Sequence, residues 1–171
     1  MALKDTLERR QRELASTPTF DKAAVIAEWR NAVNELMDEM ENFLGEYRDA
    51  GTLVFERSEA QITEEALGTY RVSQMTLRAG PAVVMFQPIG RMIIGATGRV
   101  DLYRQGHGNK NERVMALRGG PDSDWRWTLS IPPKENSFQI MKVPALVQSL
   151  QRTSAALTKE SIETALDQLL Q

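Results

Sequence analysis

A stripe of apolar residues at helical spacing is the clearest pattern along the chain, and it covers about residues 21–49. The stripe recurs every three or four positions, as on one face of an α-helix, and contains Ile26, Trp29, Val33, Leu36, Met40, Phe43 and Tyr47. Asp21 predicts the helix start as a capping residue, and Gly51 predicts its end. Gly45 predicts a weak point in the last third of the helix.

The expected length of this helix raises the question of what covers its stripe. About 29 residues at about 1.5 Å each make a helix about 43 Å long, whereas a chain of this size has a radius of gyration of about 15 Å. We therefore predict that a second subunit covers part of the stripe, through Trp29, Val33, Leu36, Met40, Phe43 and Tyr47. For the rest of the stripe, packing within the subunit is favoured over a pure coiled coil, since further apolar positions widen the stripe beyond a two-stranded seam. These positions are Val25, Ala32, Met37 and Leu44.

A shorter helix is predicted ahead of the long one. Leu3, Leu7 and Leu14 give residues 3–15 a thin apolar stripe, and Pro18 separates the two helices. Together they are expected to form a long N-terminal helical hairpin that packs on the rest of the fold.

From Thr52 onward the apolar pattern alternates, as in β-strands. Strands are predicted at residues 52–55, 70–77, 82–86, 91–94, 100–103, 114–117 and 125–131. The short connections predict hairpins and hence a mostly antiparallel meander. Within residues 70–77 the apolar positions change parity between Val72 and Met75, which predicts a β-bulge near Ser73 and Gln74.

The C-terminal part returns to helical patterns after Pro132 and Pro133. Residues 137–143 fit either a last short strand or an irregular segment, and helices are predicted at about 144–151 and 158–170. We therefore expect one α+β domain over residues 1–171, with helices to about residue 50, the sheet over about 52–143, and C-terminal helices over about 144–171.

Composition removes several classes of site. The chain has no cysteine, which excludes disulfides, thiolate nucleophiles and Cys-ligated zinc, and its single histidine is His107. Neither a metal nor a cofactor is predicted. No apolar run reaches the roughly 18 residues of a membrane span, and acidic residues stand near the start where a signal peptide is apolar. We expect a cytoplasmic protein with no membrane contact.

Charge is unevenly distributed along the chain. Residues 28–65 hold eleven acidic and three basic residues, whereas residues 91–118 hold six basic and two acidic ones. A basic patch is therefore predicted, with the members Arg91, Arg99, Arg104, His107, Lys110, Arg113 and Arg118. A nucleic-acid-binding sheet adds stacking aromatics, but Trp125 and Trp127 alternate onto the apolar face with Leu129, so nucleic-acid binding is the less favoured interpretation.

Two apparent motifs do not indicate catalysis. Gly90 and Gly95 have the spacing of a phosphate-binding loop, but the lysine that such a loop needs is absent and no helix follows, so a tight turn between strands is predicted at residues 95–98. Glu64 and Glu65 are adjacent and so diverge, which makes them more typical of surface charge than of an acid/base pair. No catalytic residues are predicted.

These patterns favour a non-enzymatic cytoplasmic protein that binds other proteins, as an adaptor does, and acts as a homodimer. The alternatives are a nucleic-acid-binding protein that uses the arginine-rich strands and loop of residues 91–118, and an enzyme whose active site is not visible in the sequence.

Overall fold

The computed structural model describes residues 2–16, 20–91, 97–106, 113–120, 123–131 and 153–171, and within them the fold is of the α+β class. The helices are α1 (Ala2–Ser16), α2 (Lys22–Phe43), α3 (Gly45–Asp49) and α5 (Lys159–Leu170). The strands are β1 (Val54–Glu64), β2 (Gly68–Ala79), β3 (Ala82–Gly90), β4 (Gly98–Arg104), β5 (Arg113–Gly120), β6 (Ser123–Ile131) and β7 (Thr153–Ala156).

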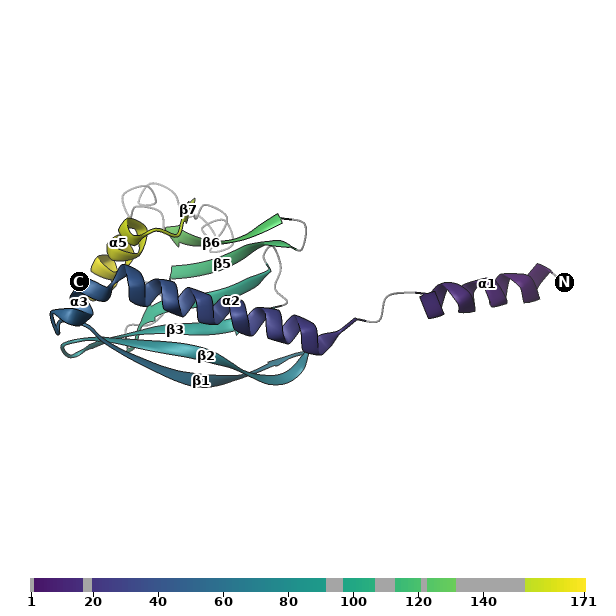
Figure 1. Cartoon of the computed structure of the whole chain (residues 1–171), viewed down its shortest axis with the longest axis horizontal. Coiled ribbons are helices and arrows are strands. Elements are labelled where there is room, and N and C mark those ends of the chain that lie inside the picture. The colour runs from purple at the N-terminus through teal and green to yellow at the C-terminus, as the bar shows by residue number, and fades with distance from the viewer. Residues whose placement is uncertain (1, 17–19, 92–96, 107–112, 121–122, 132–152) are drawn as a thin grey trace, which may run out of the picture.

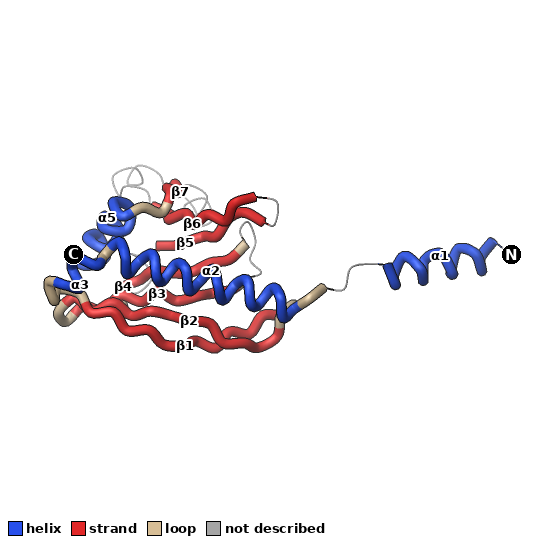
Figure 2. The backbone as a smooth tube through the Cα atoms, viewed as in Figure 1, coloured by secondary structure: helices blue, strands red, loops and turns tan. Residues whose placement is uncertain are grey.

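All of these strands lie in one sheet, and their order in space is their order along the chain. Each strand pairs antiparallel with the next one, so the predicted antiparallel meander is present, with β1 and β7 at its edges. Helix α2 runs along one face of this sheet, and α5 lies on the same side near the C-terminal end of α2 (Figure 1, Figure 2).

Helix α2 begins where the sequence predicts and ends earlier. The Asp21 carboxylate accepts a hydrogen bond from the Ala24 backbone N–H at 3.1 Å, as a capping residue does. The helix stops at Phe43, and α3 continues from Gly45 after a break at Leu44. The predicted continuous helix is therefore two helices, and α2 is only about 33 Å long. A helix of this length gives no reason to expect that a second subunit covers part of its apolar stripe.

The core lies between α2, α5 and the sheet. Its largest fully buried side chains include Trp29, Leu36, Phe86, Leu102 and Leu129, which come from one helix and three strands. Helix α5 contributes Ile162, Ala165, Leu166 and Leu169 to the same cluster. A reciprocal capping box between Thr158 and Ser161 starts α5 at the predicted position.

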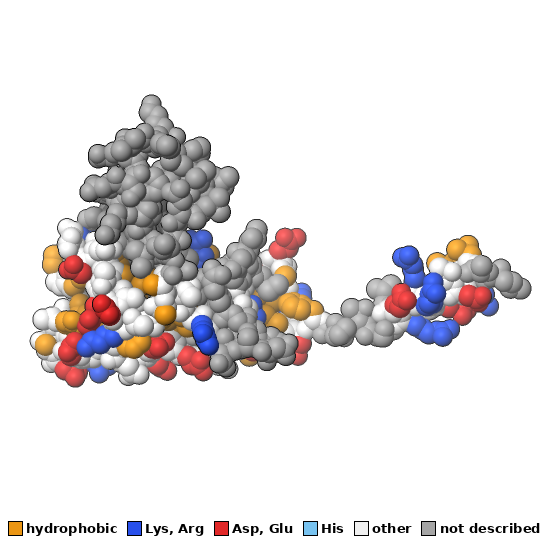
Figure 3. Space-filling view, turned by 90° about the horizontal axis from the view of Figure 1, so that it is seen from above, with side chains coloured by type: hydrophobic (Ala, Val, Ile, Leu, Met, Phe, Trp, Pro, Cys, Tyr) orange, Lys and Arg blue, Asp and Glu red, His pale blue; other side chains and the backbone are white. Residues whose placement is uncertain are grey.

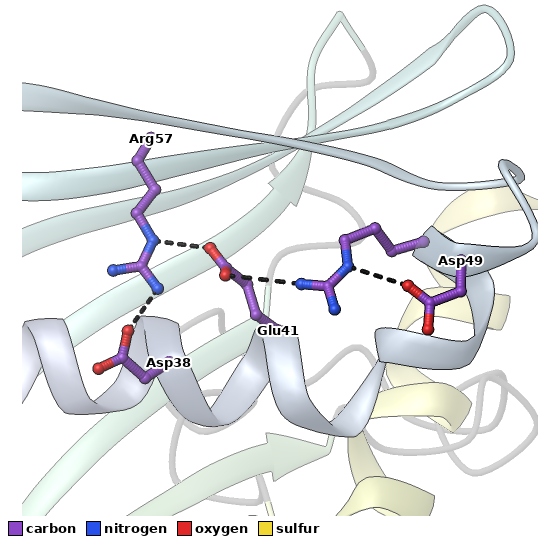
Figure 4. A network of polar contacts seen from close by, with 5 residues as sticks. Asp38, Glu41, Asp49 and Arg57 are labelled. Atoms are coloured by element: carbon purple, nitrogen blue, oxygen red, sulfur yellow. Dashed lines mark hydrogen bonds and ion pairs between the residues drawn. The ribbon is translucent and has the colours of Figure 1, made fainter.

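Strand β1 is much longer than the predicted segment at 52–55, because its charged residues hide the alternation. Arg57 is one of these charged residues. Its guanidinium reaches back to α2 and donates hydrogen bonds to Glu41 at 2.7 Å and to Asp38 at 2.6 Å (Figure 4). Glu41 also lies 4.0 Å from Arg48, which pairs with Asp49, so a chain of ion pairs links the edge strand to α2 and α3.

The change of parity predicted within β2 is present, but it is shared by two strands. On β2 the buried positions pass from Tyr70 and Val72 to Met75 and Leu77. The pairing with β1 nevertheless keeps one register from Val54 to Glu64. In both strands the set of residues that points to the core changes parity at paired positions. The β-bulge expected near residues 73–74 therefore does not shift the register between β1 and β2.

Helix α1 does not form the helical hairpin expected from the sequence. Figure 1 shows it beyond the N-terminal end of α2 and apart from the sheet, and Figure 3 shows the same separation from a second direction. Asp21 is in an extended conformation, with φ −85° and ψ 92°, and Phe20 just before it is half exposed to solvent.

The remaining predicted elements compare unevenly with the structure. The strands expected at 70–77, 82–86, 100–103, 114–117 and 125–131 are confirmed within β2 to β6. Strand β7 was not predicted. The possible strand at 137–143, the helix at 144–151 and most of the strand at 91–94 lie outside the described residues.

Candidate functional site: an acidic groove beside helix α2

A cavity of about 530 Å³ lies between α2 and the last two strands of the sheet. Its α2 wall carries carboxylates, and its other wall is mainly apolar. We call it the acidic groove, and its lining residues are Glu28, Asn31, Ala32, Glu35, Leu36, Glu39, Arg126, Trp127, Ala156 and Leu157.

The α2 wall of the groove follows from helical spacing. Glu28, Ala32, Glu35 and Glu39 are separated by four, three and four residues, so they form one line along the helix. The buried stripe of Trp29, Val33, Leu36 and Met40 follows each of them by one position. Packing of that stripe on the sheet therefore turns the line of glutamates toward β6 and β7.

The floor of the groove is aromatic and aliphatic. Trp127 of β6 is partly buried, and its ring centroid lies 6.2 Å from that of Trp29 with the rings tilted by 38°. The Leu157 backbone N–H donates to the Trp127 carbonyl at 3.3 Å, which holds the end of β7 beside β6. The alternation that predicted an inward Trp127 is thus confirmed, and part of its ring is left at the groove.

The groove has an excess of negative charge. Three of its lining residues are glutamates and one is an arginine, Arg126. Partial burial raises the pKa of Glu39 above its ordinary value, so protonation of this carboxylate begins at a higher pH than for an exposed glutamate. At neutral pH an apolar floor beneath an acidic wall suits a ligand that is both apolar and cationic.

The residues predicted as a subunit interface have another role. Trp29, Val33, Leu36 and Met40 are fully buried against their own sheet, which corrects the prediction for these four, because the sheet supplies the apolar cover that a second subunit was expected to give. Phe43 is partly buried against the same core, and Tyr47 is 37% exposed.

The predicted basic patch is not formed by those of its arginines whose side chains are described. Arg99 lies beside the buried Asp101 and makes two hydrogen bonds to it, at 2.6 and 2.8 Å. Arg104 points to the other side of the sheet and donates to the carbonyls at the end of α5. Arg91 donates to the Thr97 carbonyl at 2.7 Å. These arginines are dispersed because each neutralises or caps a local partner.

The other members of the predicted patch are less fully described. In the backbone register of β5, Arg113 pairs with Leu102, and Arg118 pairs with Arg126. His107 and Lys110 lie outside the described residues. Arg91, Arg99 and Arg104 therefore do not form one continuous basic surface for a nucleic acid.

A second polar cluster, at the end where β1, β2 and β3 meet, was missed by the sequence argument. The buried Tyr70 hydroxyl donates to Glu64, and the Arg91 backbone N–H donates to both Glu64 oxygens, at 3.0 and 3.1 Å. Burial lowers the pKa of the Arg91 guanidinium. Glu64 is thus a structural acceptor rather than the surface charge expected from its position beside Glu65.

This cluster holds the base of the glycine-rich segment. Glu64 and the Arg91–Thr97 hydrogen bond fix the chain where it leaves β3 and where it approaches β4. Strand β3 ends at Gly90 and the antiparallel β4 begins at Gly98, so a strand and not a helix follows at the position where a phosphate-binding loop requires a helix.

Within the described ranges, no group of three or more metal-ligating side chains comes together. Nor does any of the described helices have the length and apolar character that crossing a membrane requires. Comparison of the chain with protein-family models, with curated proteins and with solved structures finds no significant match.

Proposed function

We propose that this chain is a non-enzymatic cytoplasmic protein-binding protein, and that its acidic groove holds an amphipathic, basic helix of a protein partner. The observation that supports this most directly is the line of Glu28, Glu35 and Glu39 facing the apolar floor at Trp127 and Leu157. Leucine-type side chains of such a helix would cover the floor, and its lysines or arginines would face the glutamates.

The dimensions of the groove fit a helix of a few turns. Glu28 and Glu39 are eleven positions apart on α2, which corresponds to about 17 Å or three helical turns. A partner helix beside α2 would therefore have room for apolar residues at three or four successive positions of one stripe.

The proposal can be tested with a synthetic helix that has no relation to this chain. A fluorescein-labelled peptide of 16 residues, with leucines on one face and lysines on the other, is titrated with the full-length protein, and fluorescence anisotropy is measured. We expect saturable binding that weakens with salt, and at least a tenfold loss, about 1.4 kcal/mol, in the double variant Glu35→Lys/Glu39→Lys.

Two controls separate the groove from general charge attraction. The double variant Glu56→Lys/Glu59→Lys changes the net charge equally on β1, at the opposite edge of the sheet, and should bind as the wild type does. A peptide with the same composition but no apolar face should not bind. Equal binding by the two lysine variants, or by the two peptides, would contradict a helix-binding groove.

A further inference from the structure

Helix α1 presents an apolar stripe to solvent. Leu3 and Leu7 lie one turn apart and are 71% and 57% exposed, although leucines on an amphipathic helix normally face a partner surface. Figures 1 and 3 both show α1 standing clear of the sheet and of α2. In the single chain, α1 is thus a projecting arm with an uncovered face.

Most polar residues of α1 are charged, with an excess of bases. The helix carries four basic residues and three acidic ones. The bases are Lys4, Arg9, Arg10 and Arg12, and the acids are Asp5, Glu8 and Glu13. Glu8 lies 3.9 Å from Lys4 and 3.6 Å from Arg12, so it pairs with bases on both sides along the helix. Arg10 follows Leu3 by seven positions and Leu7 by three, which places it on the leucine stripe.

This arm has the properties that the acidic groove requires. Its stripe combines leucines with an arginine, whereas the groove combines an apolar floor at Trp127 and Leu157 with the glutamates of α2. The lengths also agree, because the 15 residues of α1 span about 22 Å and the glutamate line spans about 17 Å. The complementarity is both apolar and electrostatic.

We propose that α1 of one copy of this chain lies in the acidic groove of a second copy, so that the protein is a dimer formed by exchange of arms. The inference rests on the proposed function and names the helix that the groove holds. Each subunit gives one arm and receives one, so the same pair of surfaces is used twice.

The geometry at the start of α2 favours a second copy over the arm's own groove. The extended Asp21 directs the preceding chain away from α2, and the half-exposed Phe20 is not folded back onto the core. The groove begins at Glu28 and extends toward Glu39, in the direction opposite to that in which α1 leaves. Docking within one chain would require a reversal that these residues do not make.

The absence of cysteine from the natural chain allows a direct test by disulfide trapping. Full-length Leu7→Cys and Ala32→Cys proteins are mixed, oxidised and separated on a non-reducing gel. Ala32 lines the groove, so the mixture should give covalent heterodimers at least fivefold more abundant than a control mixture of Leu7→Cys with Ser58→Cys, whose cysteine lies on exposed β1. Equal yields from the two mixtures would overturn the proposal.

The double variant Leu7→Cys/Ala32→Cys distinguishes the two possible locations of the arm. Oxidation should convert this double variant to covalent dimers at a protein concentration where the control mixture of Leu7→Cys with Ser58→Cys forms no covalent dimer. If oxidation instead gives only an internally bridged monomer, the arm occupies its own groove, and exchange between copies is ruled out.

Solution mass separates failure of this inference from failure of the proposed function. Light scattering should show a dimer for the wild type and a monomer for full-length Leu3→Glu/Leu7→Glu, which should still unfold cooperatively because these side chains lie outside the core of the subunit. The synthetic helix should also bind this variant more tightly, since the competing arm is disabled. A monomeric wild type that still binds the synthetic helix would overturn arm exchange and leave the groove function intact, whereas loss of both would overturn both.

Discussion

At the scale of single residues, Gly98 shows how closely α2 approaches the sheet. A Cβ atom at this position would lie 2.3 Å from a ring carbon of Trp29, and two further ring atoms lie within 3.0 Å. Trp29 is fully buried, so its ring has no free space into which it could move. Glycine at the start of β4 is therefore a packing requirement that lets the Trp29 side chain of α2 contact the sheet directly.

We predict that Gly98→Ala destabilises the protein by about 1–3 kcal/mol, as overpacking of a core does. Urea unfolding followed by tryptophan fluorescence measures this change. Gly45→Ala is the matched control, because the new methyl group would be 3.8 Å from the nearest atom outside its local backbone, and alanine favours a helix. Gly45→Ala should be neutral or slightly stabilising, and an equal loss in both variants would contradict the packing explanation.

Tyr70 makes stability depend on pH in the alkaline range. Burial, followed by the hydrogen bond donated to Glu64, raises the pKa of Tyr70 above its ordinary value of 10.0. Below pH 10 the hydroxyl is protonated in both the folded and the unfolded state, so its contribution is intact. Above pH 10 the unfolded chain loses the proton first, and the free energy of unfolding falls with a slope of up to about 1.4 kcal/mol per pH unit.

We therefore expect Tyr70→Phe to be less stable than the wild type at pH 8 by about 1 kcal/mol, and its stability to fall less steeply between pH 10 and 11. Urea unfolding at these pH values gives both quantities. Tyr47 serves for comparison, because its hydroxyl also donates to a carboxylate, that of Glu163 at 2.9 Å, but at the surface. Tyr47→Phe should change the slope less, and parallel curves for Tyr70→Phe and wild type would refute the role of Tyr70.

At the scale of elements, the placement of α5 depends on an arginine from the sheet. The Arg104 Nη1 atom of β4 donates to the carbonyls of Leu170 at 3.2 Å and Leu169 at 3.5 Å, in the last turn of the helix. A cation at this end also offsets the negative pole of the helix dipole. Arg104 therefore joins α5 to the strand beneath it.

Arg104→Ala should lower the free energy of unfolding by about 1–2 kcal/mol and accelerate hydrogen exchange of the α5 amides more than those of β2 and β3. Arg104→Lys should recover part of the loss because it keeps the charge. Arg78→Ala is the control, since the Arg78–Glu56 pair is exposed and contributes little. A uniform change in exchange across the chain would show that Arg104 does not act through α5.

The elements also show where sequence patterns succeed. Apolar alternation identified β2 to β6, and capping residues identified the starts of α2 and α5, because these signals are local. The same patterns failed for β1, where Glu56, Arg57 and Glu59 interrupt the apolar alternation although Arg57 binds α2 across space. Gly45 was expected to weaken one helix, and the chain there makes two.

For the whole molecule, the class of fold and the antiparallel strand order could be predicted, but the site could not. The sequence shows the acidic character of residues 28–65, and the spacing of Glu28, Glu35 and Glu39 is the local signal that they share one face of a helix. No local pattern predicts that β6 lies opposite this line of glutamates. Residues 28 and 127 are far apart in the sequence, and they line the same groove only because the strands between them assemble into one sheet.

The described members of the predicted basic patch are dispersed for a related reason. Successive residues of one strand point to opposite sides of a sheet, so Arg99 and Arg104, five positions apart on β4, lie on different sides. Arg99 then pairs with Asp101 on one side of the sheet, and Arg104 donates to the end of α5 on the other. Charge counted along a chain therefore describes a surface only when the parity of each strand is taken into account.

The sequential order of the strands has a consequence for how the protein folds during synthesis. Each pair from β1–β2 to β5–β6 can form as soon as its second strand has left the ribosome, because each of these strands pairs with the one just before it in the chain. The core is different, since α2 precedes all the strands and α5 follows them, yet both bury residues in the same cluster. Strand pairing can therefore proceed while the polypeptide is still growing, whereas the cooperative burial of Trp29 and its neighbours is completed only when α5 has been synthesised.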